Sequence, residues 1–133
     1  MIHSDEDLEA YLNKLERRFE RTPDGTYLVG VGLGRPPAAV RLAPPVVVVR
    51  VTIGEAPKGD SAAAARLYRF LLEQNASSLL HAAYGIDGEN IVLSAALENR
   101  NLDINELDAV LADVDLALAE QLGKLRELAE QQS

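Results

Sequence analysis

The sequence contains no cysteine and no tryptophan, and it has only 2 histidines among its 133 residues. The absence of cysteine excludes disulfides, thiol nucleophiles and thiolate metal ligands, and it is compatible with a reducing compartment. No apolar run reaches the roughly 18 residues of a membrane-spanning helix, and the N-terminal stretch MIHSDEDLEAYL is acidic where a signal peptide is basic. We therefore expect a cytoplasmic protein that does not interact with membranes.

Basic residues are also scarce. There are 13 Lys and Arg against 21 Asp and Glu, which gives a net charge of -8. A surplus of acids disfavours binding to nucleic acid, because that binding depends on basic side chains that displace counterions. The acids are concentrated in the last 31 residues, and we interpret those of the C-terminal segment, such as Asp113, as a solvated face. The chain length and the 47% apolar content predict a single domain that spans residues 1–133.

Motifs that bind phosphate, hold a metal or carry out catalysis are missing. The segment Gly30-Val31-Gly32-Leu33-Gly34 has glycine at alternate positions, but it leads into Arg35-Pro36-Pro37 and not into a helix. A phosphate-binding loop requires the amides of a helix N-terminus, so a nucleotide site is disfavoured. His81 has no companion with metal-ligand spacing, and no serine lies in a nucleophile motif. We predict no catalytic residue, no cofactor and no metal site, so the protein is not expected to be an enzyme.

Apolar periodicity predicts three helices. The first is capped by Ser4 and continues as far as Phe19, and the second follows a cap at Asp60 or Ser61 and ends near Asn75. The third is long and opens with the capping box that begins at Asp103.

Strands are predicted between these helices. The runs 26–33 and 46–53 are rich in β-branched residues, whereas 38–43 lies between two proline pairs and is expected to be at best a short edge strand. The pair Asp87-Gly88 predicts a hairpin in which Tyr84 faces Ile91. The resulting fold is α+β, an antiparallel sheet flanked by helices, in the order α-β-β-(β)-α-β-β-α.

The two faces of this sheet differ in chemistry. Alternation places Tyr27, Val29, Val31 and Leu33 on a core face and the glycines as a bare strip on the reverse face. The reverse face is small, partly apolar and scarcely charged, and such a surface is seldom left to water. We hypothesise that it meets a partner or forms a dimer, although a helix of the same chain is an equally good cover. Its candidate residues are Leu28, Gly30, Gly32, Val48, Arg50, Thr52, His81, Val92 and Ser94.

The segment from Leu67 to Leu122 carries a family resemblance. It contains the helix end LLEQN, the strand IVLSAAL and the helix start LDINEL. With the order of elements, these patterns make the chain similar to the type III secretion chaperone-like fold, in particular its YbjN-type branch of small bacterial proteins. The resemblance implies a non-enzymatic, acidic and often dimeric protein whose surface holds a segment of a partner, or, for the YbjN branch, a regulatory role.

Two functions from different classes follow as expectations. The first is a protein-binding, chaperone-like or regulatory module that acts as a small acidic homodimer with an unknown protein or peptide client. The alternative is a small-ligand-binding or enzymatic protein that uses a pocket near Arg50 and His81. A third interpretation is a subunit held in a larger assembly through the long last helix.

Overall fold

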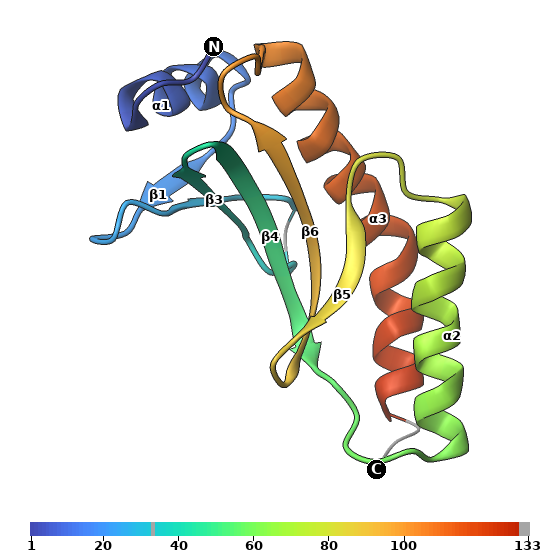
Figure 1. The fold of residues 1–133 in the computed structure, drawn as a ribbon. Coiled ribbons are helices and arrows are strands. Elements are labelled where there is room, and N and C mark those ends of the chain that lie inside the picture. The colour runs from blue at the N-terminus through green and yellow to red at the C-terminus, as the bar shows by residue number, and fades with distance from the viewer. Residues whose placement is uncertain (33, 131–133) are drawn as a thin grey trace.

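The computed structural model describes residues 1–32 and 34–130 and confirms the α+β prediction. The strands form one six-stranded antiparallel sheet in the order β1-β2-β3-β4-β6-β5 (Figure 1). The helices are α1 (Asp5–Lys14), α2 (Ala62–Ser77) and α3 (Ile104–Glu130). The strands are β1 (Phe19–Arg21), β2 (Tyr27–Val29), β3 (Ala38–Ala43), β4 (Val46–Glu55), β5 (Ala83–Asp87) and β6 (Asn90–Glu98).

The first helix is shorter than its apolar period predicts. It begins after the Ser4 cap as expected, but it ends at Lys14, and Glu16 has a φ of 57° that breaks the helical path. Phe19 starts β1 instead, where it pairs with Val29. Its ring meets the ring of Tyr27 edge-on, with 5.4 Å between the centroids. The helical spacing of Phe19 is therefore a coincidence, since its burial comes from the sheet and not from α1.

The prediction that residues 38–43 form at best an edge strand is wrong. β3 pairs with β2 on one side and with β4 on the other, for example through Val40 with Tyr27 and with Val49. The prolines do not weaken these ladders, because Pro36-Pro37 precede the strand and Pro44-Pro45 form the turn into β4. Proline disfavours a central strand only where its missing N–H belongs to the ladder.

The β5–β6 hairpin is confirmed, but its turn lies one residue later than expected. Asp87 pairs with Asn90, so the two turn residues are Gly88 and Glu89, and Gly88 adopts a φ of 60°. Glycine at the first central position is the signature of a type II′ turn. Tyr84 consequently pairs with Leu93 rather than with Ile91. Because the pairing moves by two residues, the side chains within β5 and β6 keep their predicted faces.

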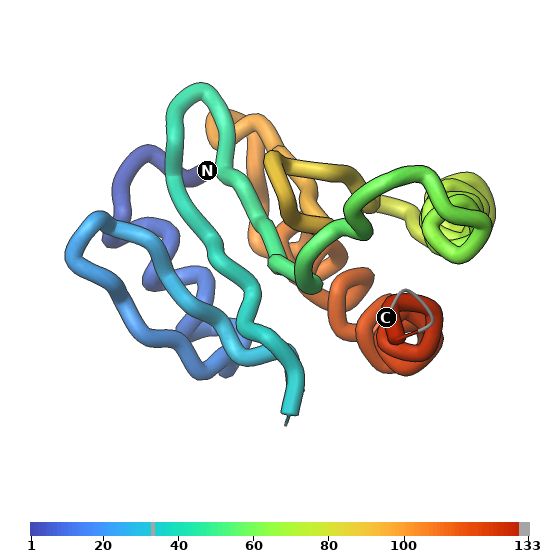
Figure 2. Tube along the Cα trace, turned by 90° about the horizontal axis from the view of Figure 1, so that it is seen from below, coloured from blue at the N-terminus to red at the C-terminus, as the bar shows by residue number. Residues whose placement is uncertain are grey.

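The core lies on one face of the sheet. Val47, Val49 and Val51 of β4 are fully buried there. Tyr27 marks the same face, and its hydroxyl donates a hydrogen bond of 3.0 Å to Glu9 of α1. α1 and α3 cover this face, whereas α2 lies beyond β5 and runs alongside α3 (Figures 1 and 2). The helical side chains in the core include Leu8 and Leu12 of α1, Leu67 and Leu71 of α2, and Leu107, Leu111, Leu118, Leu122 and Leu125 of α3.

Two polar contacts tie the N-terminal part of the chain to its C-terminal part. The guanidinium of Arg17 donates to both carboxylate oxygens of Asp115 on α3, at 3.1 and 2.7 Å. Ile2 is fully buried, and its backbone exchanges hydrogen bonds with Asn99, which follows β6. These contacts hold α1 against the sheet although it precedes every strand.

Replacement of Leu111 by Ala tests the packing of α3. Leu111 is fully buried, so the variant leaves a cavity, and we expect the free energy of unfolding to fall by about 2–5 kcal/mol. Leu116→Ala on the same helix is the matched control, because Leu116 is 54% exposed and its loss is expected to cost less than about 0.5 kcal/mol. Urea denaturation measures both, and equal effects would contradict the assigned face of α3.

Candidate functional site

The face of the sheet opposite α1 and α3 is open to solvent. Arg41 on β3 and Arg50 and Thr52 on β4 are exposed, and Val48 is half-buried. The register aligns these side chains in cross-strand rows, because residues directly opposite each other in an antiparallel sheet point to the same side. One row runs from Leu28 through Ala39 and Arg50 to Ser94. No helix of the described chain covers these residues, so the same-chain cover that we considered is absent.

Six of the nine candidate residues lie together on this open sheet face. Thr52 pairs with Val92 and Arg50 pairs with Ser94 between β4 and β6, and Val48 lies two residues away from Arg50. Leu28 lies on β2 at the far side of β3. The open sheet face is therefore defined here by Leu28, Val48, Arg50, Thr52, Val92 and Ser94.

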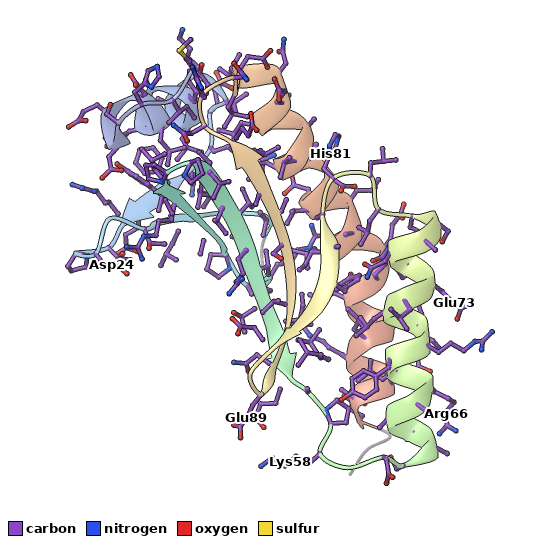
Figure 3. The ribbon with its side chains drawn as sticks, viewed as in Figure 1. Asp24, Lys58, Arg66, Glu73, His81 and Glu89 are labelled. Carbon is purple, nitrogen blue, oxygen red and sulfur yellow. The ribbon has the colours of Figure 1, made fainter. Side chains whose placement is uncertain are left out.

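The three remaining candidates lie outside the strands. Gly30 and Gly32 follow the end of β2, so the predicted bare strip along a strand does not exist. Gly32 has a φ of 124°, a backbone conformation that residues with a Cβ rarely adopt, so this turn favours glycine. Leu33, predicted to face the core, lies outside the described residues. His81 lies in the loop before β5, at the end of that strand away from Glu89 (Figure 3).

An ion pair neutralises the charge of Arg50 on the open sheet face. The guanidinium of Arg50 on β4 lies 2.6 Å from the carboxylate of Asp87 on β5. The pair reaches across β6, where Val92 is buried although it belongs to the open side of the sheet. The sequence analysis missed this partner because it assigned Asp87 to the turn. The paired charges leave the centre of the face close to neutral.

The described residues give no support to a pocket near Arg50 and His81. Neither side chain lines any of five well-formed cavities that lie within residues 1–32 and 34–130. Within the same ranges, no group of three or more His, Cys, Asp or Glu residues is placed to hold a metal ion. No described helix is long and apolar enough to cross a bilayer.

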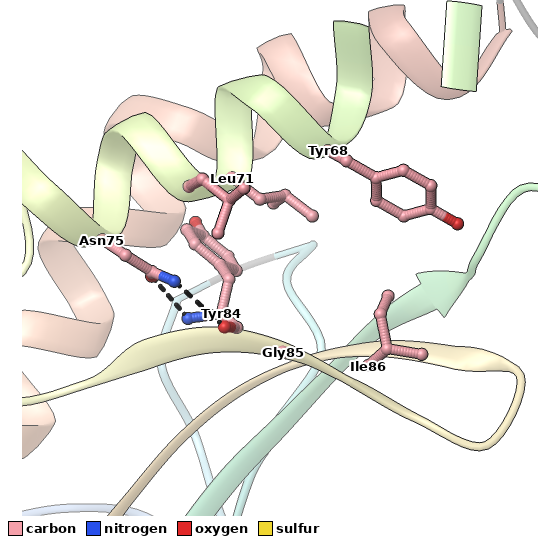
Figure 4. Close-up of a pocket in the computed structure, with 7 residues that line it drawn as sticks. Tyr68, Leu71, Asn75, Tyr84, Gly85 and Ile86 are labelled. Atoms are coloured by element: carbon pink, nitrogen blue, oxygen red, sulfur yellow. Dashed lines mark hydrogen bonds between the residues drawn. The ribbon is translucent and has the colours of Figure 1, made fainter. Parts of the chain in front are cut away.

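The most apolar of these cavities is a groove between α2 and β5. It has a volume of about 250 Å³, and its walls include Tyr68, Leu71 and Leu72 from α2 and Tyr84 and Ile86 from β5 (Figure 4). A second cavity of about 430 Å³ shares Tyr68 and Ile86 with it and continues to Lys58 and Glu89. We call the two together the α2–β5 groove. The sequence analysis did not predict the groove. The periodicity of apolar residues indicates the buried face of each helix or strand, but it does not indicate how far apart two elements lie.

Two side chains satisfy the first part of the β5 edge. The amide of Asn75 at the end of α2 accepts from the Tyr84 N–H at 2.7 Å and donates to the Tyr84 carbonyl at 3.1 Å (Figure 4). The carboxylate of Asp113 on α3 accepts from the N–H groups of His81 and Ala82 at 2.9 and 3.0 Å. Asp113 is buried, so its interpretation as part of a solvated acidic face is wrong. Asn75 thus takes the place of a seventh strand at Tyr84, and Asp113 does so at the two residues that precede β5.

Tyr84 links this edge to α3. Its hydroxyl donates a hydrogen bond of 2.6 Å to Gln121, whose amide donates in turn to Gln74 of α2 at 3.1 Å. Burial and, to a smaller extent, the negative charge of Asp113 together raise the pKa of Tyr84 to about 12. The neutral phenol is thus the form that the folded protein favours.

An antiparallel sheet with helices on one face and an open opposite face is the architecture of a known class of proteins. Solved structures of type III secretion chaperones and of YbjN share this architecture. The chain belongs to the CesT_Tir_1 family of type III chaperones, because the model of that family matches residues 1–131. A comparison with curated protein sequences finds no significant match.

Three solved structures illustrate the likeness. A chain of the ExoU–SpcU heterodimeric complex of the Pseudomonas aeruginosa type III secretion system has a TM-score of 0.66 and 19% identity, over 91% of this chain and 96% of that one. YbjN from E. coli has a TM-score of 0.66 and 14% identity, over 98% and 96%. The Yersinia pestis chaperone SycH, in complex with a fragment of YscM2, has a TM-score of 0.57 and 19% identity, over 91% and 98%. At these identities the likeness concerns the fold.

The raised pKa of Tyr84 predicts a loss of stability in alkali. The group titrates near its ordinary value of 10.0 when unfolded and at about 12 when folded, so its contribution is complete below pH 10. As the pH rises to 12 the free energy of unfolding is expected to fall by up to about 2 kcal/mol. In Tyr84→Phe this slope becomes shallower, although the variant is less stable at neutral pH because Gln121 loses its donor. Urea denaturation at several pH values measures it, and an unchanged slope would contradict the assignment.

Proposed function

We propose that this protein is a non-catalytic cytoplasmic chaperone that holds an extended segment of a client polypeptide on its open sheet face. The observation that carries the proposal is the chemistry of that face, on which Leu28, Val48 and Val92 surround a neutralised ion pair. A flat surface that is partly apolar and nearly uncharged in its centre suits the side chains of an extended segment better than it suits a small polar substrate.

The family supports the protein-binding part of this proposal. CesT_Tir_1 is a chaperone family, and several solved structures with the same fold contain a chaperone with an effector or with a fragment of another protein. The rival function, a ligand pocket at Arg50 and His81, has no cavity in its favour among the five described.

We further propose that the protein acts as a homodimer. Leu80 is 84% exposed in the loop after α2, and Leu116 is 54% exposed on α3. Both lie beside Asp113, because the Leu80 N–H is 3.5 Å from the Asp113 carboxylate and residues 113 and 116 are one helical turn apart. Leu80 and Leu116 thus form an exposed aliphatic surface next to Asp113, and we propose that a second copy of the chain packs against this surface, which we call the seam.

A charge on the open sheet face tests client binding. We expect Thr52→Asp to reduce the recovery of a client from an extract of the native cells by about tenfold, because the added carboxylate would be desolvated beneath the bound segment. Thr52 is exposed, so the fold is expected to tolerate the change. Ala10→Asp on the exposed side of α1 is the matched control. Equal recovery of the same client by both variants would contradict the assigned face.

The homodimer is tested by measurement of the molar mass in solution. Light scattering is expected to give a mass about twice that of the 14.4 kDa chain, and Leu80→Glu should shift the population toward the monomer. Ala10→Glu, far from this seam in the sequence and exposed, should leave the mass unchanged. A strict monomer at all protein concentrations would rule the dimer out.

A further inference from the structure

We infer that the client segment of the open sheet face carries two acidic residues at alternate positions, which bind Arg41 and Arg50. Asp24 and Asp87, which pair with these arginines in the unbound protein, are then internal competitors for the client. The inference rests on the proposed protein-binding function and adds a sequence preference to it. A client can bind this face without such a preference, so the inference and the proposed function can fail separately.

The central strands of the sheet carry arginine and no acid. The stretch 26–54, which contains β2, β3 and nearly all of β4, has three arginines and neither Asp nor Glu. The whole chain has a net charge of -8, so this stretch differs in sign from the rest. Arg41 and Arg50 share the open side of the sheet, because Arg50 pairs with Ala39 and Arg41 is two residues further along the same strand. The positive charge of the central strands is thus directed to the surface that the client is proposed to occupy.

Acids on the same side of the sheet lie at its margins. Glu20 is on the edge strand β1, opposite Leu28, and Glu98 is the last residue of β6. A long acidic run would be repelled at these margins, whereas two carboxylates over the central arginines would be attracted. The local charges decide at physiological ionic strength, because charges more than about 8 Å apart on a surface are largely screened. The face therefore favours a short acidic motif between uncharged residues.

The separation of the two arginines fits an extended polypeptide. Arg41 on β3 pairs with Val48, which is two residues from Arg50 on β4, so the two arginines are diagonal neighbours. Diagonal neighbours in a sheet are roughly 7–8 Å apart. In an extended segment, alternate side chains point to the same side and are about 7 Å apart, so acids at alternate positions match this spacing. Leu28 and Val48 are half-buried and still offer apolar surface to the residues that flank the acids.

The present partners of the two arginines can be displaced. Both side chains of the Arg50–Asp87 pair are exposed, by 43% and 62%. The Arg41–Asp24 pair is exposed by 55% and 64%, and its N–O distance is 4.0 Å. Ion pairs that are this accessible to water contribute little to stability. Asp24 also keeps its turn without Arg41, because its carboxylate accepts from the Thr26 N–H at 3.2 Å. A client carboxylate can therefore replace either acid without disturbing the fold.

The test uses the full chain and a short fluorescent peptide with a glutamate–valine–glutamate centre flanked by leucines. We expect saturable binding by fluorescence anisotropy, and binding about three- to tenfold weaker when both glutamates are replaced by glutamine. Arg41→Gln and Arg50→Gln should each reduce this difference, and the variant with both changes should abolish it. Arg69→Gln on α2 is the matched control, because Arg69 is 82% exposed and lies outside the sheet.

Asp87→Asn isolates the internal competition. It removes the acid but keeps the size of the side chain, so Arg50 loses its carboxylate partner. The glutamate peptide should then bind about three- to tenfold more tightly than it binds the unchanged protein, whereas the glutamine peptide should not gain. Glu73→Gln on α2 removes the same charge outside the sheet and should change neither affinity. If Arg50→Gln does not fold, as judged by circular dichroism, Arg41→Gln and Asp87→Asn decide the result.

Four outcomes would overturn the inference. The first is the absence of saturable binding, and the second is equal affinity for the glutamate and glutamine peptides. The third is a preference for glutamate that persists in the double arginine variant, which would show that the peptide binds elsewhere. The fourth is a homodimer that this double variant dissociates, because acids of a second copy would then occupy the arginines. The proposed function is decided separately. A client that Thr52→Asp fails to recover, but that the double arginine variant recovers as well as the unchanged protein, would leave the open sheet face in use without the acidic preference.

Discussion

The packing of α3 against one face of the sheet is the constraint on which the rest of the structure depends. Leu107, Leu111 and Leu118 bury the centre of that face, and α1 adds its own leucines at the β1–β2 end. A helix of 27 residues, together with α1, leaves no room on the covered face for a further helix. α2 is consequently displaced to the sheet edge, and no described helix is left to cover the opposite face. The open sheet face thus follows from how the other face is filled.

The displacement of α2 also explains the unusual edge of β5. A strand at a sheet edge exposes unpaired N–H and C=O groups, which proteins satisfy or shield to avoid unwanted strand pairing. Here a helix stands beside the edge instead of a strand, and only the side chains of Asn75 and Asp113 reach the backbone. The shielding ends at Ile86, where α2 diverges enough to leave the α2–β5 groove. The position of α2 therefore explains both why the first half of the β5 edge is hydrogen-bonded and why the second half is exposed.

The sequence predicts those features whose signal is local and fails where tertiary contacts compete. Alternating valines at positions 47, 49 and 51 correctly identify the core face of β4, and the glycine turn identifies the hairpin. Phe19 misleads because a helical spacing and a strand pairing can both bury it. Asp113 resembles any surface acid of an amphipathic helix, and only the fold shows that three backbone N–H groups point at it. The open sheet face was predictable in outline, but the groove depends on where α2 docks.

Charge distribution connects these features to function. On the open sheet face the ion pair of Arg50 and Asp87 neutralises both charges, so under the proposed function a bound segment would not have to match a charge there. At the α2–β5 groove the carboxylates of Glu55 and Glu89 lie beside an apolar wall. Asp87 affects the charge of both surfaces. Its ion pair with Arg50 neutralises the arginine on the open sheet face, and it leaves one unpaired acid fewer near the α2–β5 groove.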